Sequence, residues 1–481
     1  MDTNALIDIV HEVQGQLWVD KVNETYRTGH LCQWVSTFHP DKLPCQLDGT
    51  FHHGAFNAGM KMVFGDSTAW MVRFPRVRMV CDEYTDEKVA MEVTALNLIR
   101  NSTTIPVPRV EAWGRAASNP LGLGPFIIME FIDGIGLSDL LRDPTAKRPT
   151  RVMREDISDS DIEVIYRQMA NFLLQLFKLD FDRIGSLPDR EAEAPTPSRP
   201  LTFKAHCILQ NGGVDTFGNR TEGFATTTEY FQYVVGQDVE QLFRQPNSIV
   251  GFHDAKSISV AFRVLQSLIP DLVHPEYDRC KFKLICDDLG LANLIVRSKE
   301  DLTIAGVVDL EWSYLGPAQL FGSSPWWLLQ DRPVNSTWDY DDDGKPPKIA
   351  ARYFRYLESF MRILQEEEAK MPEHQEKELS SLVKWSQDSG TMWLHMLILS
   401  GFNDNHSFPF IQLRRHIGET EWARREEIYN PSELEVFAER KVKELNKYDE
   451  ALEKLEQSKL LVDSGDMTMQ EFVSNALNQS G

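Results

Sequence analysis

Two adjacent acids and an amide stand next to two apolar runs in residues 281–297, KFKLICDDLGLANLIVR. The acids are Asp287 and Asp288, and the amide is Asn293 in the second apolar run. A carboxylate beside a buried strand is costly unless a metal, a cation or a proton transfer uses it. This segment is therefore the first place in the chain where chemistry is expected.

Residues 289–310 predict a β-hairpin, with NLIVR and LTIAGVVD as strands and SKED as the turn. If the turn centres near Asp301, Asn293 and Asp309 lie opposite each other at the open end of the hairpin. Both offer oxygen ligands of the kind that Mg²⁺ prefers, and Asp288 lies on the loop that enters the same hairpin. The alternative is a hairpin with polar ends, in which an acid only caps a turn.

The spacing from Asp288 to Asn293 is the D-x-x-x-x-N of a kinase catalytic loop, with Asp309 as the later metal-binding acid. In phosphoryl transfer a carboxylate accepts the proton of the attacking hydroxyl, and Mg²⁺ offsets the charge of the phosphates. We therefore expect Asp288 to be the catalytic base and Asn293 and Asp309 to be metal ligands. We expect Asp287 to face solvent; the alternative is that it adds negative charge near a cationic substrate.

A helix over residues 86–100 and a strand before it supply a second polar pair. Glu92 falls inside an apolar stripe that is made at helical spacing by Val89, Val93, Leu96 and Ile99. A carboxylate on a buried face needs a cation, and Arg73 in the strand AWMVRFP is the candidate. Such a pair positions phosphates in kinases, with Arg here where Lys is usual. The alternative is that Arg73 is exposed and that Glu92 reaches solvent from the edge of the stripe.

Two further segments predict contacts with a nucleotide. Gly54 and Gly59 lie between possible strands, so their loop could cover phosphates with Asn57 at its tip. FIIMEFIDG reads as a buried strand that leaves the first lobe, and backbone groups around Glu130–Ile132 could meet an adenine. An ordinary hairpin loop and a plain linker are the alternatives.

The predicted secondary structure changes from strands to helices along the chain. Residues 51–132 are rich in short strands, whereas long helices are predicted over 160–179, 227–245 and 254–269. The prediction is an α+β, two-lobed, protein-kinase-like fold with a small antiparallel sheet and a larger helical lobe. The expected units are a helical N-terminal extension (1–50), a nucleotide-binding N-lobe (51–132), a catalytic and substrate-binding C-lobe (133–430) and a charged helical C-terminal extension (431–481).

Charge and cysteine content restrict partners and location. A formal net charge of −22 argues against nucleic acid or an anionic membrane as a partner, because both would repel the chain. Six cysteines without regular spacing suit reduced thiols. Since no secretory leader and no membrane-length apolar run is evident, we expect a cytoplasmic protein. The oligomeric state is left open.

Six segments between about residues 51 and 330 together resemble the aminoglycoside phosphotransferase and choline-kinase-like family, particularly its fungal members. They are WMVRFP, MEVTALNLIRNSTTIPVPRVEAWG, FIIMEFIDG, CDDLGLANLIV, IAGVVDLEWSYLGP and SPWWLL. The resemblance implies ATP between two lobes and Mg²⁺ at the hairpin. It also implies Asp288 as base, Asn293 and Asp309 as metal ligands, and Arg73 with Glu92 as the pair that positions the phosphates.

The same resemblance implies a small-molecule kinase that phosphorylates a hydroxyl of an aminoglycoside-like or amino-alcohol-like acceptor. The acid runs at 338–344 and 366–368 could attract a cationic acceptor, and Trp326 and Trp327 could line its pocket, although solvated surface and core packing are the alternatives. Cys286 stands where the family usually has a His. This departure leaves a second hypothesis, a non-catalytic kinase-fold protein that acts by binding.

Overall fold

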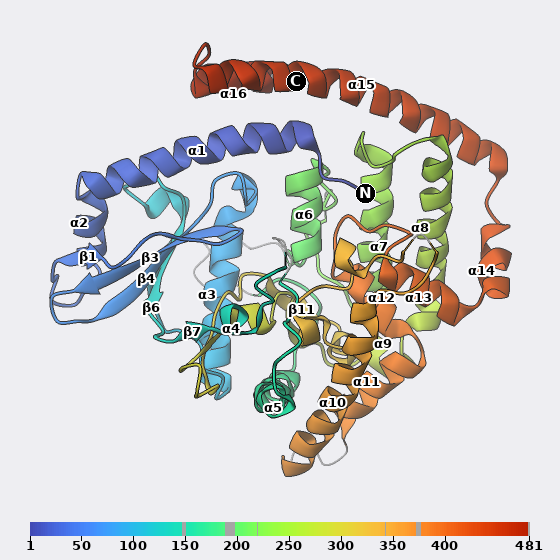
Figure 1. Ribbon diagram of the computed structural model, residues 1–481, viewed down its shortest axis with the longest axis horizontal. Helices are drawn as coiled ribbons and strands as arrows, with labels where there is room; N and C mark the ends of the chain where they lie inside the picture. Colours follow the sequence, from blue (N-terminus) through green and yellow to red (C-terminus); the bar gives the residue numbers. More distant parts are fainter. Residues whose placement is uncertain (147–150, 188–197, 219, 342, 372–376, 480–481) are drawn as a thin grey trace.

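The computed structural model describes residues 1–146, 151–187, 198–218, 220–341, 343–371 and 377–479. A smaller lobe is built on an antiparallel sheet, and a larger lobe is mainly helical (Figure 1). The predicted α+β, two-lobed, kinase-like architecture is thus confirmed.

The sheet of the smaller lobe has the strand order β1-β3-β4-β6-β5, with β2 paired to β3. Along β4, Trp70, Val72 and Phe74 are buried on one face, while Met71 and Arg73 point to the other because side chains alternate along a strand. The strands are β1 (Cys45–Leu47), β2 (His52–His53), β3 (Asn57–Phe64), β4 (Ala69–Pro75), β5 (Val110–Gly114) and β6 (Phe126–Glu130).

Helices α1 (Ala5–Arg27) and α2 (His30–Ser36) cover the apolar face of this sheet. Trp18 and Trp34 pack there in one cluster with the buried residues of β3 and β4. Part of the predicted N-terminal extension (1–50) therefore completes the core of the smaller lobe. Strand β1 also belongs to this predicted extension, yet it is part of the sheet.

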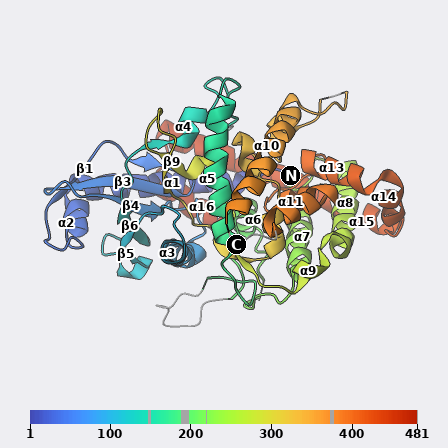
Figure 2. The ribbon, with the colours of Figure 1, turned by 90° about the horizontal axis from the view of Figure 1, so that it is seen from below.

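Helix α3 (Thr85–Ser102) lies on the other face of the sheet. Its predicted stripe is buried: Val89 and Val93 pack against β6, and Leu96 and Ile99 join the core of the larger lobe. Figure 2 shows α3 beside the sheet. Glu92 on this stripe is only 1% exposed, so its carboxylate is held inside the protein as expected.

The larger lobe encloses one extensive apolar core. The three long helices predicted from the sequence are present as α5, α7 and α8. The helices of this lobe are α4 (Leu137–Leu141), α5 (Asp159–Phe177), α6 (Phe203–Gly212), α7 (Thr227–Arg244), α8 (Phe252–Leu272), α9 (Pro275–Asp278), α10 (Lys348–Lys370), α11 (Glu378–Asp388), α12 (Thr391–Ile398), α13 (Phe408–Ile417) and α14 (Glu419–Glu426).

Two short sheets carry the polar loop between the lobes. The predicted hairpin is formed by β9 (Leu294–Val296) and β10 (Ile304–Val307), with β7 (Ile135–Gly136) beside β9. The strands β8 (Lys283–Cys286) and β11 (Ser313–Gly316) pair next to it. These strands are the rigid elements from which the site is built.

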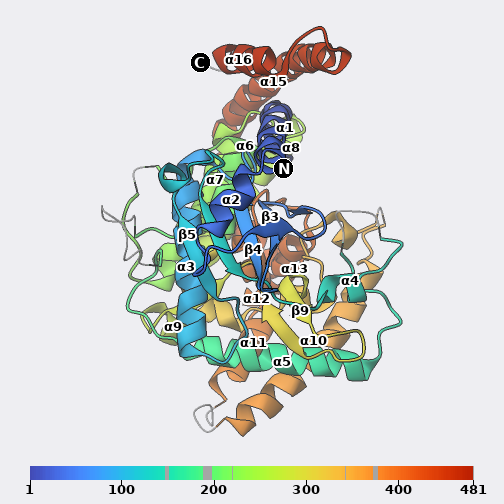
Figure 3. The same cartoon turned by 90° about the vertical axis from the view of Figure 1, so that its left-hand side faces the viewer.

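The first and last helices lie side by side. Helix α15 (Pro431–Ser464) packs on α8 and α1, and α16 (Met469–Gln479) also packs on α1 (Figure 3). The Ala5 N–H donates to the Tyr448 hydroxyl at 2.8 Å. Among the described helices, none combines the length and the apolar character needed to cross a membrane.

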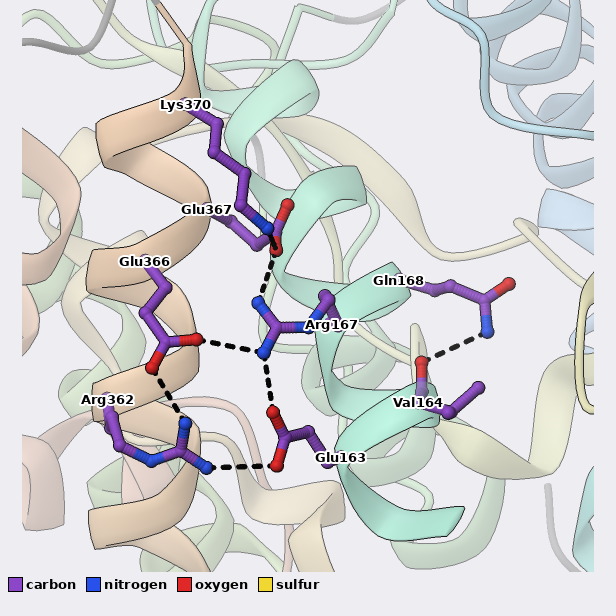
Figure 4. Close-up of polar contacts among 8 residues, drawn as sticks. All are labelled: Glu163, Val164, Arg167, Gln168, Arg362, Glu366, Glu367 and Lys370. Carbon is purple, nitrogen blue, oxygen red and sulfur yellow. Dashed lines mark hydrogen bonds and ion pairs between the residues drawn. The ribbon is translucent and has the colours of Figure 1, made fainter. Parts of the chain in front are cut away.

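Charged side chains link α5 to α10 at the surface of the larger lobe (Figure 4). Arg167 donates to Glu163, Glu366 and Glu367 at 2.6, 2.8 and 2.6 Å, and its pKa is raised by these bonds. Arg362 donates to Glu366 at 2.7 Å. Acids of the 366–368 run therefore serve a contact between helices.

We expect Arg167→Ala to lower the free energy of unfolding by about 1 kcal/mol at low salt, because several partially shielded ion pairs are lost together. The loss should shrink in 1 M salt, where screening weakens ion pairs. Urea unfolding at both salt concentrations measures it. Lys384→Ala, which removes one exposed pair with Asp388, is the control, and an equal effect of the two variants would contradict the cooperative network.

Candidate active site

A cavity of about 310 Å³ lies between the two lobes. Every predicted site residue except Glu92 lines it: Gly54, Asn57, Gly59, Arg73, Glu130, Ile132, Asp288, Asn293 and Asp309. These residues come from the turn after β2, from β3 and β4, from the end of β6 and the connector after it, from the loop after β8 and from the hairpin. Residues far apart in sequence are thus gathered around one space.

The hairpin holds Asn293 and Asp309 at its open end. Leu294 is paired with Val307, and the Val308 N–H donates to the Asn293 carbonyl at 2.9 Å. Asp309 follows with a φ of 64°, a left-handed conformation that acids tolerate better than most residues. The predicted juxtaposition of the amide and the acid is therefore present.

Asp288 is held from two sides. The Asn293 amide nitrogen donates to the Asp288 carboxylate at 3.2 Å and to its carbonyl at 2.9 Å. The Arg332 guanidinium donates to the other carboxylate oxygen at 2.9 Å. A carboxylate has about four lone-pair sites, so Asp288 can still accept a hydroxyl proton from an acceptor.

The same hydrogen bonds bear on metal binding. Because the Asn293 nitrogen faces Asp288, its amide oxygen is left for another partner. Within the described ranges, no group of three or more His, Cys, Asp or Glu side chains could hold a metal. Asn293 and Asp309 nevertheless fit Mg²⁺, which commonly takes one or two protein oxygens together with phosphate oxygens and water.

Arg73 joins the two lobes. It donates to Glu92 of α3 at 2.7 Å and to Asp309 of the hairpin at 2.7 Å. Burial alone lowers the pKa of Arg73, but Glu92, Asp309 and Glu311 outweigh it and raise the pKa above its usual value. The predicted pairing of Arg73 with Glu92 is confirmed, and the exposed alternative for Arg73 is wrong.

Two charged residues beside this pair were missed in the sequence. Lys88 of α3 is fully buried, and its ammonium contacts Glu311. Burial first, and then the charge of Asp309, raise the pKa of Glu311 to about 7. Helical spacing put Lys88 on the same face as Glu92, and Glu311 stands only two residues after Asp309, in the turn before β11, so both signals were available.

Asn57 does not occupy the tip of a loop. It is the first residue of β3, its side chain is buried, and it donates to Glu311 at 2.6 Å. The turn before it contains Gly54, whose N–H donates to the Asn57 carbonyl at 2.9 Å. The expected position of Asn57 at a loop tip was therefore wrong. The side chain points inward because its amide forms hydrogen bonds with the buried charged groups of Glu311 and Lys88.

Asp287 is buried, which corrects the expectation that it faces solvent. The side chain is 3% exposed, and one carboxylate oxygen accepts from the Phe203 N–H at 3.4 Å. Its other oxygen has no hydrogen-bond partner among the described residues. Burial raises the pKa of Asp287 to about 7. The Asp287 N–H donates to the Trp312 carbonyl at 3.2 Å, so this position continues the β8–β11 pairing and its side chain turns inward.

The raised pKa of Asp287 makes stability depend on pH. An unfolded Asp has a pKa of about 3.9, so above that pH the unfolded chain releases a proton that the folded chain keeps. Stability therefore falls as pH rises toward 7, and by up to about 3 kcal/mol between pH 5 and 8. We expect Asp287→Asn to lack this part of the fall. Urea unfolding of the wild type and of Asp287→Asn at the two pH values measures it. If the difference in unfolding free energy between the two proteins is the same at both pH values, a neutral Asp287 is contradicted.

Cys286 and the paired tryptophans lie around this loop. The Ser313 hydroxyl donates to the Cys286 sulfur at 3.3 Å, and burial raises the pKa of the thiol to about 12, so it is a neutral packing group. Trp327 belongs to the core, whereas Trp326 is partly exposed. A Cβ atom on Gly290 would lie 2.7 Å from the Trp326 ring, so glycine is needed where the loop after β8 crosses Trp326.

The fold and this interlobe site define a two-lobed kinase-like protein. No protein-family model matches the chain. It is similar to a putative aminoglycoside phosphotransferase from Ralstonia eutropha, with 14% identity, a TM-score of 0.41, and coverage of 87% of this chain and 98% of that one. It is also similar to a microcompartment-associated aminopropanol kinase, with 16% identity, a TM-score of 0.38, and coverage of 82% and 94%.

The curated relatives are fungal. The chain is 27% identical over 160 residues to altered inheritance of mitochondria protein 9 of Clavispora lusitaniae, a match over 33% of this chain and 23% of that protein. The protein of the same name in Komagataella phaffii is 27% identical over 148 residues, which are 31% of this chain and 23% of that protein. The match thus spans less than a quarter of each relative. Both are named as mitochondrial, which contradicts the cytoplasmic location predicted from the sequence.

Proposed function

We propose that this chain is an ATP- and Mg²⁺-dependent phosphotransferase that transfers the γ-phosphate to a hydroxyl of a small molecule. The observation that carries the proposal is the meeting of Asp288, Asn293 and Asp309 in one cavity, with Arg73 bound to both Glu92 and Asp309. A protein that only binds would not need a general base, an amide and an acid at this spacing.

Each side chain has a proposed task. Asp288 accepts the proton of the attacking hydroxyl, and its bonds to Asn293 and Arg332 keep the carboxylate aimed. Asn293 and Asp309 would hold Mg²⁺, which when bound offsets the negative charge of the phosphates. Arg73, fixed by Glu92, offers its remaining N–H donors to a phosphate oxygen.

The lobes take the roles expected from the sequence. Residues 51–132 bind the nucleotide, with Gly54 and Gly59 near its phosphates and the backbone of Glu130–Ile132 near its base. Residues 133–430 supply catalysis and the acceptor site. The sequence suggested an aminoglycoside-like or amino-alcohol-like acceptor, and the groups beside Asp288 bear on the charge of that compound.

Thermal unfolding with and without Mg·ATP tests the proposal. A ligand at a hundred times its Kd adds about 2.7 kcal/mol to stability, so the melting temperature of the wild type should rise clearly. Asp309→Ala should lose most of the rise, whereas Asp301→Ala in the exposed hairpin turn should keep it. No rise in the wild type would reject the enzyme and favour a kinase-fold protein that acts by binding another partner.

The names of the relatives also suggest a location. We propose that the chain resides in mitochondria, as those proteins are named to do. Fractionation of yeast cells that express the tagged chain would show it in the mitochondrial pellet and protected from added protease. Recovery in the soluble fraction alone would reject this location.

A further inference from the structure

Arg332 is a cation fixed against the proposed catalytic base. One of its terminal nitrogens donates to the Asp288 carboxylate at 2.9 Å and to the Asp287 carbonyl at 3.0 Å. The guanidinium also lies 3.9 Å from the centre of the Trp326 ring and 5.4 Å from that of Phe203. Its side chain is 16% exposed. Stacking and hydrogen bonds therefore hold the charge in one place.

Some N–H groups of the Arg332 guanidinium are not used by these contacts. Of its five N–H groups, the two on the nitrogen that faces Asp288 and Asp287 are used. Within the described ranges, no acceptor contacts the other three. A largely buried guanidinium with free donors is suited to a carboxylate or phosphate, because both accept its N–H groups in pairs.

Arg332 opens onto space beside the base. It lines a cavity of about 10 Å³ that adjoins another of about 100 Å³, and the two share Ser323, Ser324 and Trp326. The Ser323 hydroxyl is buried and has no partner among the described residues. The larger of the two cavities is also lined by Asp287. Unused polar groups thus lie together beside Arg332, with room for a few atoms in the larger cavity on the side of Asp287.

The acids that contact Arg332 do not favour a cation, and the 366–368 run serves a contact between helices. Glu366 and Glu367 are bound to Arg167 between α5 and α10, and Glu368 accepts the Leu379 N–H at 2.8 Å. The acids that face Arg332 are Asp288, which it neutralises, and Asp287, whose pKa burial raises to about 7. A positively charged acceptor at this place would meet Arg332 at close range.

On the basis of the proposed function, we infer that the acceptor is a small hydroxyl compound that carries its own carboxylate or phosphate, bound by Arg332. The acceptor oxygen forms a bond to the γ-phosphorus, its proton passes to Asp288, and the bond from the γ-phosphorus to the β–γ bridging oxygen breaks to leave ADP. Arg332 is a specificity-determining residue in this reaction, since it binds the carboxylate or phosphate of the acceptor.

Four compounds on one three-carbon frame test the charge of the acceptor: glycerol, 3-amino-1,2-propanediol, glycerate and glycerol 3-phosphate. Their binding is measured by calorimetry on the full chain saturated with Mg²⁺ and the non-hydrolysable analogue AMPPNP, which fills the γ-phosphate position. We expect at least one anionic compound to bind about tenfold or more tighter than glycerol, and the amine to bind most weakly. Comparison of glycerate with glycerol 3-phosphate distinguishes a carboxylate from a phosphate.

Variants assign the preference to Arg332. Arg332→Gln should abolish the preference for the anion, and Arg332→Lys should keep part of it, with AMPPNP binding retained in both. Arg297→Gln, at an exposed pair with Asp301, should change nothing. A preference for the amine, no anion binding in the millimolar range, or an anion affinity unchanged by Arg332→Gln would overturn the inference. Loss of AMPPNP affinity alone in Arg332→Gln would also overturn it, by assigning Arg332 to the nucleotide.

The two levels of the proposal fail in different ways. If AMPPNP with Mg²⁺ does not bind the wild type, the proposed function is rejected, and the inference with it. If AMPPNP binds but no preference for an anion depends on Arg332, only the acceptor class is rejected.

Discussion

Asp288→Asn is expected to lower kcat by about 10²–10⁴-fold, the usual loss when a positioned general base is removed. An Asn side chain at this position can still accept a hydrogen bond from Arg332, but it cannot take the proton of an attacking hydroxyl. KM for ATP should change little, since the nucleotide is bound by other residues. Release of ADP in the presence of the acceptor measures the effect.

The matched control for this loss is Asp301→Asn in the exposed turn of the same hairpin, which should keep full turnover. Circular dichroism and the melting temperature with Mg·ATP show whether Asp288→Asn retains its fold and its nucleotide. A variant that is folded, binds the nucleotide and still turns over at the wild-type rate would remove Asp288 from the mechanism.

Lys88→Met is expected to lower the free energy of unfolding by about 3–5 kcal/mol, which is typical when one partner of a buried ion pair is removed. Lys88 is fully buried, and Glu311 beside it is 2% exposed, so the remaining carboxyl would have neither water nor its main cation. Urea unfolding near pH 8, where Glu311 is ionised, measures the largest effect.

Two comparisons show whether the loss comes from the buried charge. Lys88→Met combined with Glu311→Gln should recover part of the stability, because a neutral amide replaces the stranded carboxylate. Lys281→Met removes a pair with Asp182 at the surface and should cost far less, because exposed ion pairs contribute little. Equal losses in Lys88→Met and Lys281→Met would contradict a buried charge pair.

Local patterns predicted the parts of the site that depend on local structure. The hairpin was predictable because its two apolar strands are joined by a short polar turn, and that turn fixes Asn293 opposite the residues before Asp309. The pairing of Arg73 with Glu92 was predictable because a carboxylate on an apolar helical stripe needs a buried cation. In both cases the sequence spacing alone determines which side chains can meet.

The parts that were missed depend on packing between distant segments. Whether Asp287 faces solvent is decided by Phe203 and by β11, which are remote in sequence. Asn57 was expected at a loop tip because its buried partner, Glu311, lies in the other lobe and no nearby residue indicates the contact. Arg332 reaches Asp288 only because the chain after Trp326 folds back over the catalytic loop, and no local spacing indicates that path.

The packing of the terminal helices has a mechanical consequence. Helix α1 covers the sheet of the smaller lobe and also contacts α6 and α15, so it adds a contact between the lobes to the connector after β6, the buried face of α3 and the ion pairs of Arg73. Each such contact must be kept or broken when the lobes move apart. We therefore expect the cleft to open by a small displacement of the lobes rather than by a wide separation.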